Sequence, residues 1–195
     1  MKTLILMRHA KSSWKDSNLP DCERPLNKRG KRDAPLMGKV LIEKELIPQK
    51  ILCSTAVRTL QTLDELVKAI GYTGEVEILD SLYMAEQSVY LEELTRQPDT
   101  LERILVIGHN PGLESLVQIF SHRVESLPTA AVAHIVLPIQ HWSELSIDIE
   151  GDLVELFLPE EVREQVEVEP SKEKKDHKDH KDKKEKDKKD HKDKK

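Results

Sequence analysis

Short apolar runs alternate along the first 160 residues with longer segments whose apolar positions recur at helical spacing. The runs predict strands over Thr3–Met7, Lys50–Ser54, Val76–Leu79, Arg103–Ile107, Ala131–Pro138 and Leu153–Leu158. The longer segments predict helices over Asn27–Lys44, Ala56–Ile70, Val89–Arg96 and Pro111–Ser121. Strands that alternate with helices in this way are typical of βαβ units around a parallel sheet.

The last two predicted strands differ from the others in their connection. Residues 139–152 separate them, which is too short for a crossover helix, so we expect an antiparallel pair at one edge of the sheet. The predicted fold class is α/β, a three-layer sandwich with a mixed, mainly parallel central sheet. A chain of 195 residues is the right length for one such domain.

The alternation stops after Pro159. We expect a domain over residues 1–160, followed over 161–195 by an acidic linker and a tail rich in Lys, Asp and His. The last 25 residues contain no Leu, Ile, Val or aromatic residue, so the tail is expected to be disordered. A solvating role is favoured for it, and weak binding of a transition metal by His177, His180 and His191 is the alternative.

The tail changes the interpretation of the net charge. It carries thirteen lysines against eight acidic residues, so the net charge of −5 conceals an excess of ten acidic residues over positions 1–170. An acidic domain argues against broad nucleic-acid binding, and any basic site on it has to be local. No apolar run approaches the length of a membrane span or a signal peptide, and the two cysteines make no disulfide framework. We therefore expect a cytoplasmic protein.

Polar residues follow three of the predicted strands where these end. Arg8 and His9 follow the first strand, Arg58 comes just after the second, and His109 follows the fourth. Because the carboxyl ends of parallel strands share one edge, these side chains should meet in one crevice. Each of them alone has an ordinary explanation as a strand end, a surface helix residue or a helix cap. Together with two helix starts they predict an anion site that suits a phosphoryl group.

The residue types also suggest a mechanism. A neutral His9 imidazole is a competent nucleophile, and the neighbouring arginines disfavour its protonated form. Arg8 and Arg58 can hold phosphoryl oxygens by bidentate hydrogen bonds, and His109 can donate another. Further candidates for contact with substrate are Lys11, Ser12 and Asn110.

Several motifs together resemble the SixA-type phosphohistidine phosphatases, within the phosphoglycerate mutase-like histidine phosphatase superfamily. They are the segments 8–12, 21–30, 54–62, 82–83, 106–111 and 128–131, and the resemblance spans about residues 1–159. It implies that His9 is the phosphorylated nucleophile and that Arg8, Arg58 and His109 form the phosphate pocket. It also implies a metal- and cofactor-independent enzyme without the large inserted helical subdomain of some relatives.

The implied substrate is a phosphohistidine-containing protein, typically a phosphotransfer domain of a two-component relay, and we expect a monomer that acts without a membrane or nucleic acid. The chain departs from the pattern at Lys15, where mutase relatives have an asparagine, and at Met84, near the position of their acid. Asp80 and Glu86 are the candidate acids close to that position. One alternative is a phosphatase for small phosphate esters or anhydrides, and a less favoured one is a non-catalytic module that binds phosphorylated partners.

Overall fold

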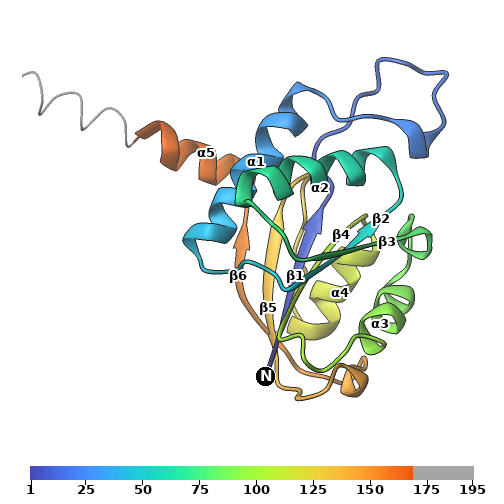
Figure 1. The fold of residues 1–195 in the computed structure, drawn as a ribbon, viewed down its shortest axis with the longest axis vertical. Coiled ribbons are helices and arrows are strands. Elements are labelled where there is room, and N and C mark those ends of the chain that lie inside the picture. The colour runs from blue at the N-terminus through green and yellow to red at the C-terminus, as the bar shows by residue number, and fades with distance from the viewer. Residues whose placement is uncertain (169–195) are drawn as a thin grey trace, which may run out of the picture. The chain divides into compact units, whose positions relative to one another are not determined.

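The structure is a computed structural model that describes residues 1–168. Its first compact unit, Met1–Pro159, is built on a single six-stranded sheet (Figure 1). The strand order is β3-β2-β4-β1-β5-β6. The strands are β1 (Lys2–Arg8), β2 (Lys50–Ser54), β3 (Glu75–Leu79), β4 (Arg103–Gly108), β5 (Val132–Leu137) and β6 (Asp152–Phe157).

The strand directions confirm a mixed, mainly parallel sheet. β1 pairs in parallel with β4, β4 with β2, and β2 with β3. β5 pairs antiparallel with both β1 and β6, which gives the expected antiparallel pair at one edge. The central strands β1, β2 and β4 are largely apolar and buried because helices cover both faces of the sheet.

The helices that connect the parallel strands form the outer layers. α1 (Lys28–Glu43) and α2 (Val57–Ile70) pack against each other, as do α3 (Gln87–Thr95) and α4 (Gly112–Ser121). Strand side chains alternate between the faces, and Leu4 and Leu6 point into the cluster that α3 and α4 cover. No large subdomain interrupts this order in the part of the chain that the structure describes, and the three-layer α/β prediction is confirmed.

Local sequence explains where the first two helices begin and end. The Asn27 side chain accepts a hydrogen bond from the Gly30 N–H and so caps α1. α2 ends at Gly71, whose φ of 60° is in the left-handed region that glycine adopts without strain. The four predicted helices agree with the observed ones to within two residues at each end.

One further helix, α5 (Pro159–Val168), was not predicted and lies in the stretch that we expected to be an acidic linker. No helix in residues 1–168 is long and apolar enough to cross a membrane. The predictions for the tail, including disorder and metal binding by its three histidines, fall outside the described residues.

Candidate active site

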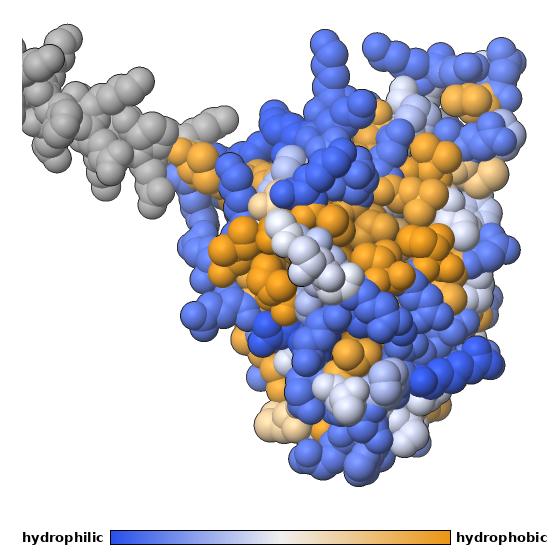
Figure 2. Space-filling model, in the orientation of Figure 1, coloured by the Kyte–Doolittle hydropathy of each residue, from blue (hydrophilic) through white to orange (hydrophobic). Residues whose placement is uncertain are grey.

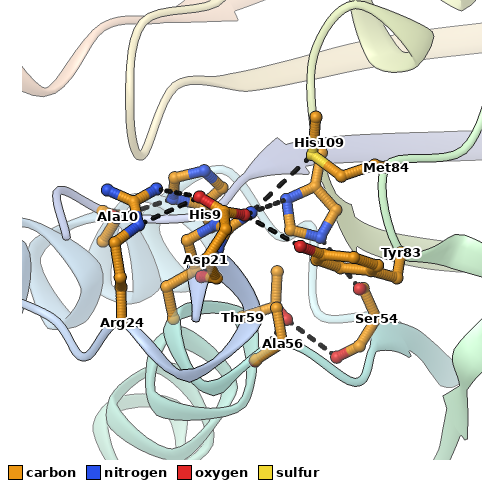
Figure 3. A network of polar contacts seen from close by, with 11 residues as sticks. His9, Ala10, Asp21, Arg24, Ser54, Ala56, Thr59, Tyr83, Met84 and His109 are labelled. Atoms are coloured by element: carbon orange, nitrogen blue, oxygen red, sulfur yellow. Dashed lines mark hydrogen bonds and ion pairs between the residues drawn. The ribbon is translucent and has the colours of Figure 1, made fainter. Parts of the chain in front are cut away.

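Strand register brings the two predicted histidines together. Arg8 is the register partner of Gly108 in the parallel pair of β1 and β4, so His9 and His109 leave the sheet side by side. Their ring centroids are 5.3 Å apart, and both side chains are buried (Figure 3). Gly108 is required here because a Cβ at this position would overlap the Tyr90 hydroxyl, which accepts a hydrogen bond from the His109 N–H at 3.1 Å.

The hydrogen bonds of His9 define its protonation. Its Nδ1 lies 2.8 Å from the Ala10 carbonyl oxygen, which can only accept, so the proton is on Nδ1. Nε2 then carries the free lone pair, and no residue among 1–168 hydrogen-bonds to it. Burial, with Arg58 and Arg8 contributing, lowers the pKa of His9 to about 4. His9 is therefore a neutral imidazole at pH 7.

Arg58 is placed by the first turn of α2, directly after β2. It is 2% exposed, and it donates through Nη1 to the Asp21 carbonyl at 2.6 Å and through Nη2 to the Asp21 carboxylate at 2.9 Å. Nη2 is also 3.4 Å from His109 Nδ1, whereas Nε is buried and has no hydrogen-bond partner. A buried guanidinium with an unused N–H is a ready donor to an anion.

His109 has the opposite tautomer to His9. Arg58 can only donate, so His109 Nδ1 accepts, and Nε2–H donates to Ser54 Oγ at 2.8 Å. Burial and the Arg58 charge lower the pKa of His109 to about 3. Because a serine hydroxyl can also donate, Ser54 can support either neutral tautomer of His109.

Arg8 is anchored on the other side of the site by a loop carbonyl. Its Nη1 donates to the Leu127 oxygen at 2.8 Å, and the Asn110 amide donates to the same oxygen at 3.0 Å. Arg8 Nε and Asn110 Oδ1 are buried without a partner. Burial is the main reason that the pKa of Arg8 is lowered, and the Arg58 charge adds to it. The structure therefore brings together Arg8, His9, Arg58 and His109, with Asn110 beside them.

The site contains a carboxylate that sequence reasoning did not assign. Asp21 lies in a short 3₁₀ turn, Asp21–Glu23, and accepts hydrogen bonds from Arg58, Tyr83 and Arg24 at 2.9, 2.9 and 3.0 Å (Figure 3). These donors lower the pKa of Asp21 against the effect of burial, so the carboxylate is ionised at neutral pH. The only sequence signal for its role was its place in a motif of the resemblance.

Arg24 and Tyr83 complete the rim of the site. The Arg24 guanidinium carbon is 3.5 Å from the ring centroid of Trp14, which is 72% exposed, and Nη1 of Arg24 is buried without a partner. The Tyr83 ring meets the His109 ring edge-on, with 5.6 Å between the centroids. Met84 approaches Arg58 Nη2 through its sulfur at 3.7 Å and has a φ of 50°, which is unusual for a non-glycine residue.

The remaining predicted site residues form no side-chain hydrogen bond or ion pair with the four central side chains in residues 1–168. Lys11 is exposed, and Ser12 is buried in an isolated bridge with Leu26. The exposed Asp80 accepts a hydrogen bond from Thr55 at 2.9 Å, and the exposed Glu86 precedes α3. Neither candidate acid reaches His9 or His109 through a hydrogen bond in the described part of the chain.

Two backbone contacts fix the segment that carries His9. The Ala10 N–H donates to Thr62 Oγ1 at 2.9 Å, which ties the end of β1 to α2. The Ala130 N–H donates to the carbonyl oxygens of Arg8 and His9, at 3.2 and 3.1 Å, from a residue with a φ of 66°. Neither the site nor any other part of residues 1–168 groups three His, Cys, Asp or Glu side chains as a metal site.

Known proteins are similar to this chain in sequence. A family model described as histidine phosphatase superfamily (branch 1) matches residues 4–83. An uncharacterized protein of Mycobacterium tuberculosis is 32% identical over 150 residues, which are 71% of this chain and 91% of that protein. The chain belongs to the histidine phosphatase superfamily.

Solved structures place this superfamily member beside the SixA proteins. A putative phosphohistidine phosphatase SixA from Nakamurella multipartitia has a TM-score of 0.68 at 28% identity, over 81% of this chain and 96% of that one. A putative SixA from Agrobacterium tumefaciens has a TM-score of 0.70 at 23% identity, over 81% and 98% of the two chains. The histidine phosphatase described above is thus a SixA-like phosphatase in fold and family.

Proposed function

We propose that this protein is a phosphohistidine phosphatase that works through a covalent phosphohistidine at His9. The observation that carries the proposal is the state of the His9 ring. It is buried and neutral, with its proton fixed on Nδ1 by Ala10, its Nε2 lone pair free, and the charges of Arg58 and Arg8 acting on the ring. A histidine in this state is a nucleophile, because neither protonation nor a hydrogen bond blocks Nε2.

In the first step, His9 Nε2 attacks the phosphorus of the substrate. A bond forms between Nε2 and phosphorus as the bond from phosphorus to the substrate imidazole nitrogen breaks, and that imidazole leaves with a proton from solvent. Ring charge that develops on phosphorylation is stabilised by the Ala10 carbonyl through Nδ1–H. In the second step, water attacks phosphorus as the bond between phosphorus and His9 Nε2 breaks. The protons of the attacking water stay on the departing phosphate or pass to solvent, and His9 returns to the neutral Nδ1–H tautomer.

The two arginines provide the electrostatic part of catalysis. Their buried N–H groups without partners, Nε of Arg8 and Nε of Arg58, are donors for phosphoryl oxygens. These fixed charges compensate the phosphoryl group in a site of low exposure, where each interaction is stronger than in water. The proposed mechanism therefore assigns no step to a metal ion.

We assign His109 a role that depends on Ser54. In the free enzyme its Nδ1 faces Arg58 and cannot donate. When a phosphoryl oxygen takes over the Nη2–H that faces Nδ1, with Arg58 still paired to Asp21, His109 can lose its Nε2 proton to solvent and take one up at Nδ1. The Nδ1–H then points at the phosphoryl oxygen, and the Ser54 hydroxyl donates to Nε2. His109 then acts as the additional donor that the sequence predicts.

The acid–base groups favour a phosphoramidate over an alkyl ester. An alkoxide leaving group needs a strong general acid, but Asp21 is held ionised by its donors. Asp80 and Glu86 lie outside the hydrogen-bond network of the site. An imidazole leaving group is readily protonated by solvent, so this site can cleave a P–N bond without a dedicated acid. Small esters and anhydrides remain the second candidate substrates, and anhydrides have good leaving groups of their own.

The exposed rim favours a protein-borne phosphohistidine such as that of a phosphotransfer domain. No inserted subdomain within residues 1–168 covers the site, and Trp14 and Met84 at its rim are 72% and 50% exposed. A phosphohistidine on a protein surface needs this access, whereas a small ester could also be processed in a closed pocket.

The test measures phosphate release by wild type and by His9→Ala in excess chelator. The substrate is a phosphotransfer domain that carries a phosphohistidine, and an alkyl phosphate is tested in parallel. We expect wild type to release phosphate from the phosphohistidine protein and His9→Ala to release none while keeping the wild-type melting temperature. Faster turnover of the alkyl ester would show that the enzyme acts on small phosphate esters and not on phosphohistidine. Phosphohistidine turnover by a folded His9→Ala variant would remove the covalent mechanism, and binding without any turnover would favour the non-catalytic module.

A further inference from the structure

A second feature of the described chain lies next to the active site but takes no part in the proposed chemistry. It is a cavity of about 470 Å³ between the loop after β1 and the start of α1. The residues that line it include Ser13, Lys15, Pro25, Lys28, Arg29 and Lys31. The lining thus includes four cations and no acidic side chain.

The charge of this cavity is largely uncompensated. Lys15, Lys28 and Lys31 are exposed, and none of them forms an ion pair with a residue in 1–168. Only Arg29 has a carboxylate partner, the buried Asp33, at 3.2 Å. Residues 1–170 carry ten more acidic than basic residues, so this concentration of cations is opposite in sign to the domain that carries it.

Short segments connect the cavity to the nucleophile. Ser13 is four residues after His9, so the cavity begins within about 14 Å of the nucleophile along the chain. The Ser13 N–H donates to the Pro25 carbonyl at 2.8 Å, which pairs the two segments that line the cavity. Arg24, next to Pro25, donates a hydrogen bond to the Asp21 carboxylate, which also accepts one from Arg58.

We propose that this cation-lined cavity binds acidic side chains on the protein that carries the phosphohistidine, next to the phosphorylated residue. The proposal rests on the proposed function for the identity of the phosphoryl group and adds the chemistry of the partner surface. Charge complementarity is the main argument, since long exposed lysines steer and align an acidic surface. In Figure 2 the upper edge of the molecule, over the loop and the start of α1, is largely hydrophilic.

A protein partner fits this surface better than a small polyanion. The exposed Trp14 lies in the sequence between two lining residues, Ser13 and Lys15, and aromatic side chains of this kind are enriched at protein interfaces. The cations are spread over two segments of the chain and do not converge on one buried point. A row of acidic side chains can engage such an arrangement, and a single small anion engages only part of it.

The test compares two peptides that carry the same non-hydrolysable phosphohistidine analogue, one flanked by glutamates and the other by glutamines. Their dissociation constants are measured by fluorescence anisotropy with full-length wild type, with K15E/K28E and with K39E/K68E. The last variant is the matched control, because it makes the same charge change at exposed lysines that do not line the cavity. All three proteins keep the Lys-rich tail, so its contribution is the same in each comparison.

We expect wild type to bind the glutamate peptide about tenfold more tightly than the glutamine peptide at low salt, and K15E/K28E to lose that preference. K39E/K68E should retain it. Equal binding of the two peptides by wild type, or an equal loss in both charge variants, would overturn the proposal. A third result would also overturn it: wild type binds pyrophosphate more tightly than the glutamate peptide, and only K15E/K28E loses this pyrophosphate binding. The cavity would then be a site for a small polyanion.

Phosphoramidate turnover by wild type is measured alongside as a test of the proposed function. If wild type shows no turnover but still prefers the glutamate peptide, the proposed enzyme activity is wrong and the proposed docking site stands. If wild type turns over the phosphoramidate but does not prefer the glutamate peptide, the docking site is wrong and the enzyme activity stands. The two proposals therefore fail separately.

Discussion

His9 and His109 share one buried site but hold their protons on different ring nitrogens. The Ala10 carbonyl fixes the proton of His9 on Nδ1, and the Arg58 guanidinium leaves the proton of His109 on Nε2. The division of labour in the proposed mechanism follows from this difference, because only His9 has a free Nε2 lone pair.

Nitrogen-15 NMR of histidine-labelled protein tests this difference directly. We expect His9 to be a neutral Nδ1–H tautomer with a pKa of about 4, and His109 to be a neutral Nε2–H tautomer with a pKa of about 3. Addition of tungstate as a phosphoryl analogue should move the His109 proton to Nδ1. A His9 that titrates above pH 6, or that carries its proton on Nε2, would contradict the account.

Asp21 gives a second prediction about a single residue of the site. Its carboxylate holds Arg58 and Tyr83, so Asp21→Asn should keep the fold but leave the Arg58 guanidinium less well oriented. We expect kcat on a phosphohistidine substrate to fall about 10- to 100-fold, because small misplacements of a catalytic group have costs of this order. Tyr83→Phe, which removes one hydrogen bond and keeps the charge, should cost less. Unchanged kcat in Asp21→Asn would mean that Arg58 is positioned without it.

At the residue scale, the placement of a side chain could be predicted from the sequence where a strand end determines it. Arg8, His9, Arg58 and His109 follow strands whose order and direction bring them together. Asp21 and Tyr83 could not be assigned in this way, because the irregular loop between β1 and α1 brings Asp21 back to the site. Hydrogen bonds to Arg58, Arg24 and Tyr83 hold that loop in place, and no periodic pattern in the sequence encodes them.

The strands are the elements on which the site depends most closely. β1 and β4 each deliver a histidine, and the register between them sets the distance between the two rings. Periodicity predicted these strands because they are short, apolar and bounded by polar residues. It missed α5, although Pro159 followed by two glutamates is a recognisable helix start. The low apolar content of that stretch outweighed the signal.

The end of β4 is the element most sensitive to added volume. In Gly108→Ala, the new methyl group would overlap the Tyr90 hydroxyl, and the hydrogen bond to the His109 N–H would be strained. We expect a loss of about 1–3 kcal/mol in the free energy of unfolding, measured by urea denaturation. Removing the hydroxyl in a Gly108→Ala/Tyr90→Phe double variant should restore part of that loss. If the single variant is as stable as wild type, the close approach at Gly108 is not a constraint.

The whole molecule should become less stable in mild acid because of its two buried neutral histidines. An unfolded chain with histidine pKa values near 6.5 binds more protons than the folded chain between pH 6.5 and about 4. The free energy of unfolding should therefore fall as pH drops through this window, by up to about 1.4 kcal/mol per pH unit for each histidine.

Urea denaturation of wild type and His9→Gln at several pH values measures this dependence. The glutamine variant cannot titrate at position 9, so its stability should fall less steeply between pH 6.5 and 4. Parallel curves for the two proteins would show that the pKa of His9 is not lowered by folding.

The most direct test of the central claim is to locate the phosphoryl group during turnover. Wild type is mixed with a phosphohistidine protein whose phosphoryl group carries an isotope label. The reaction is quenched in alkali within milliseconds, and the protein is digested and analysed by mass spectrometry. The account predicts an alkali-stable, acid-labile phosphoryl group on His9 that forms and decays at rates consistent with turnover. Release of phosphate without label on His9 at any time would contradict it.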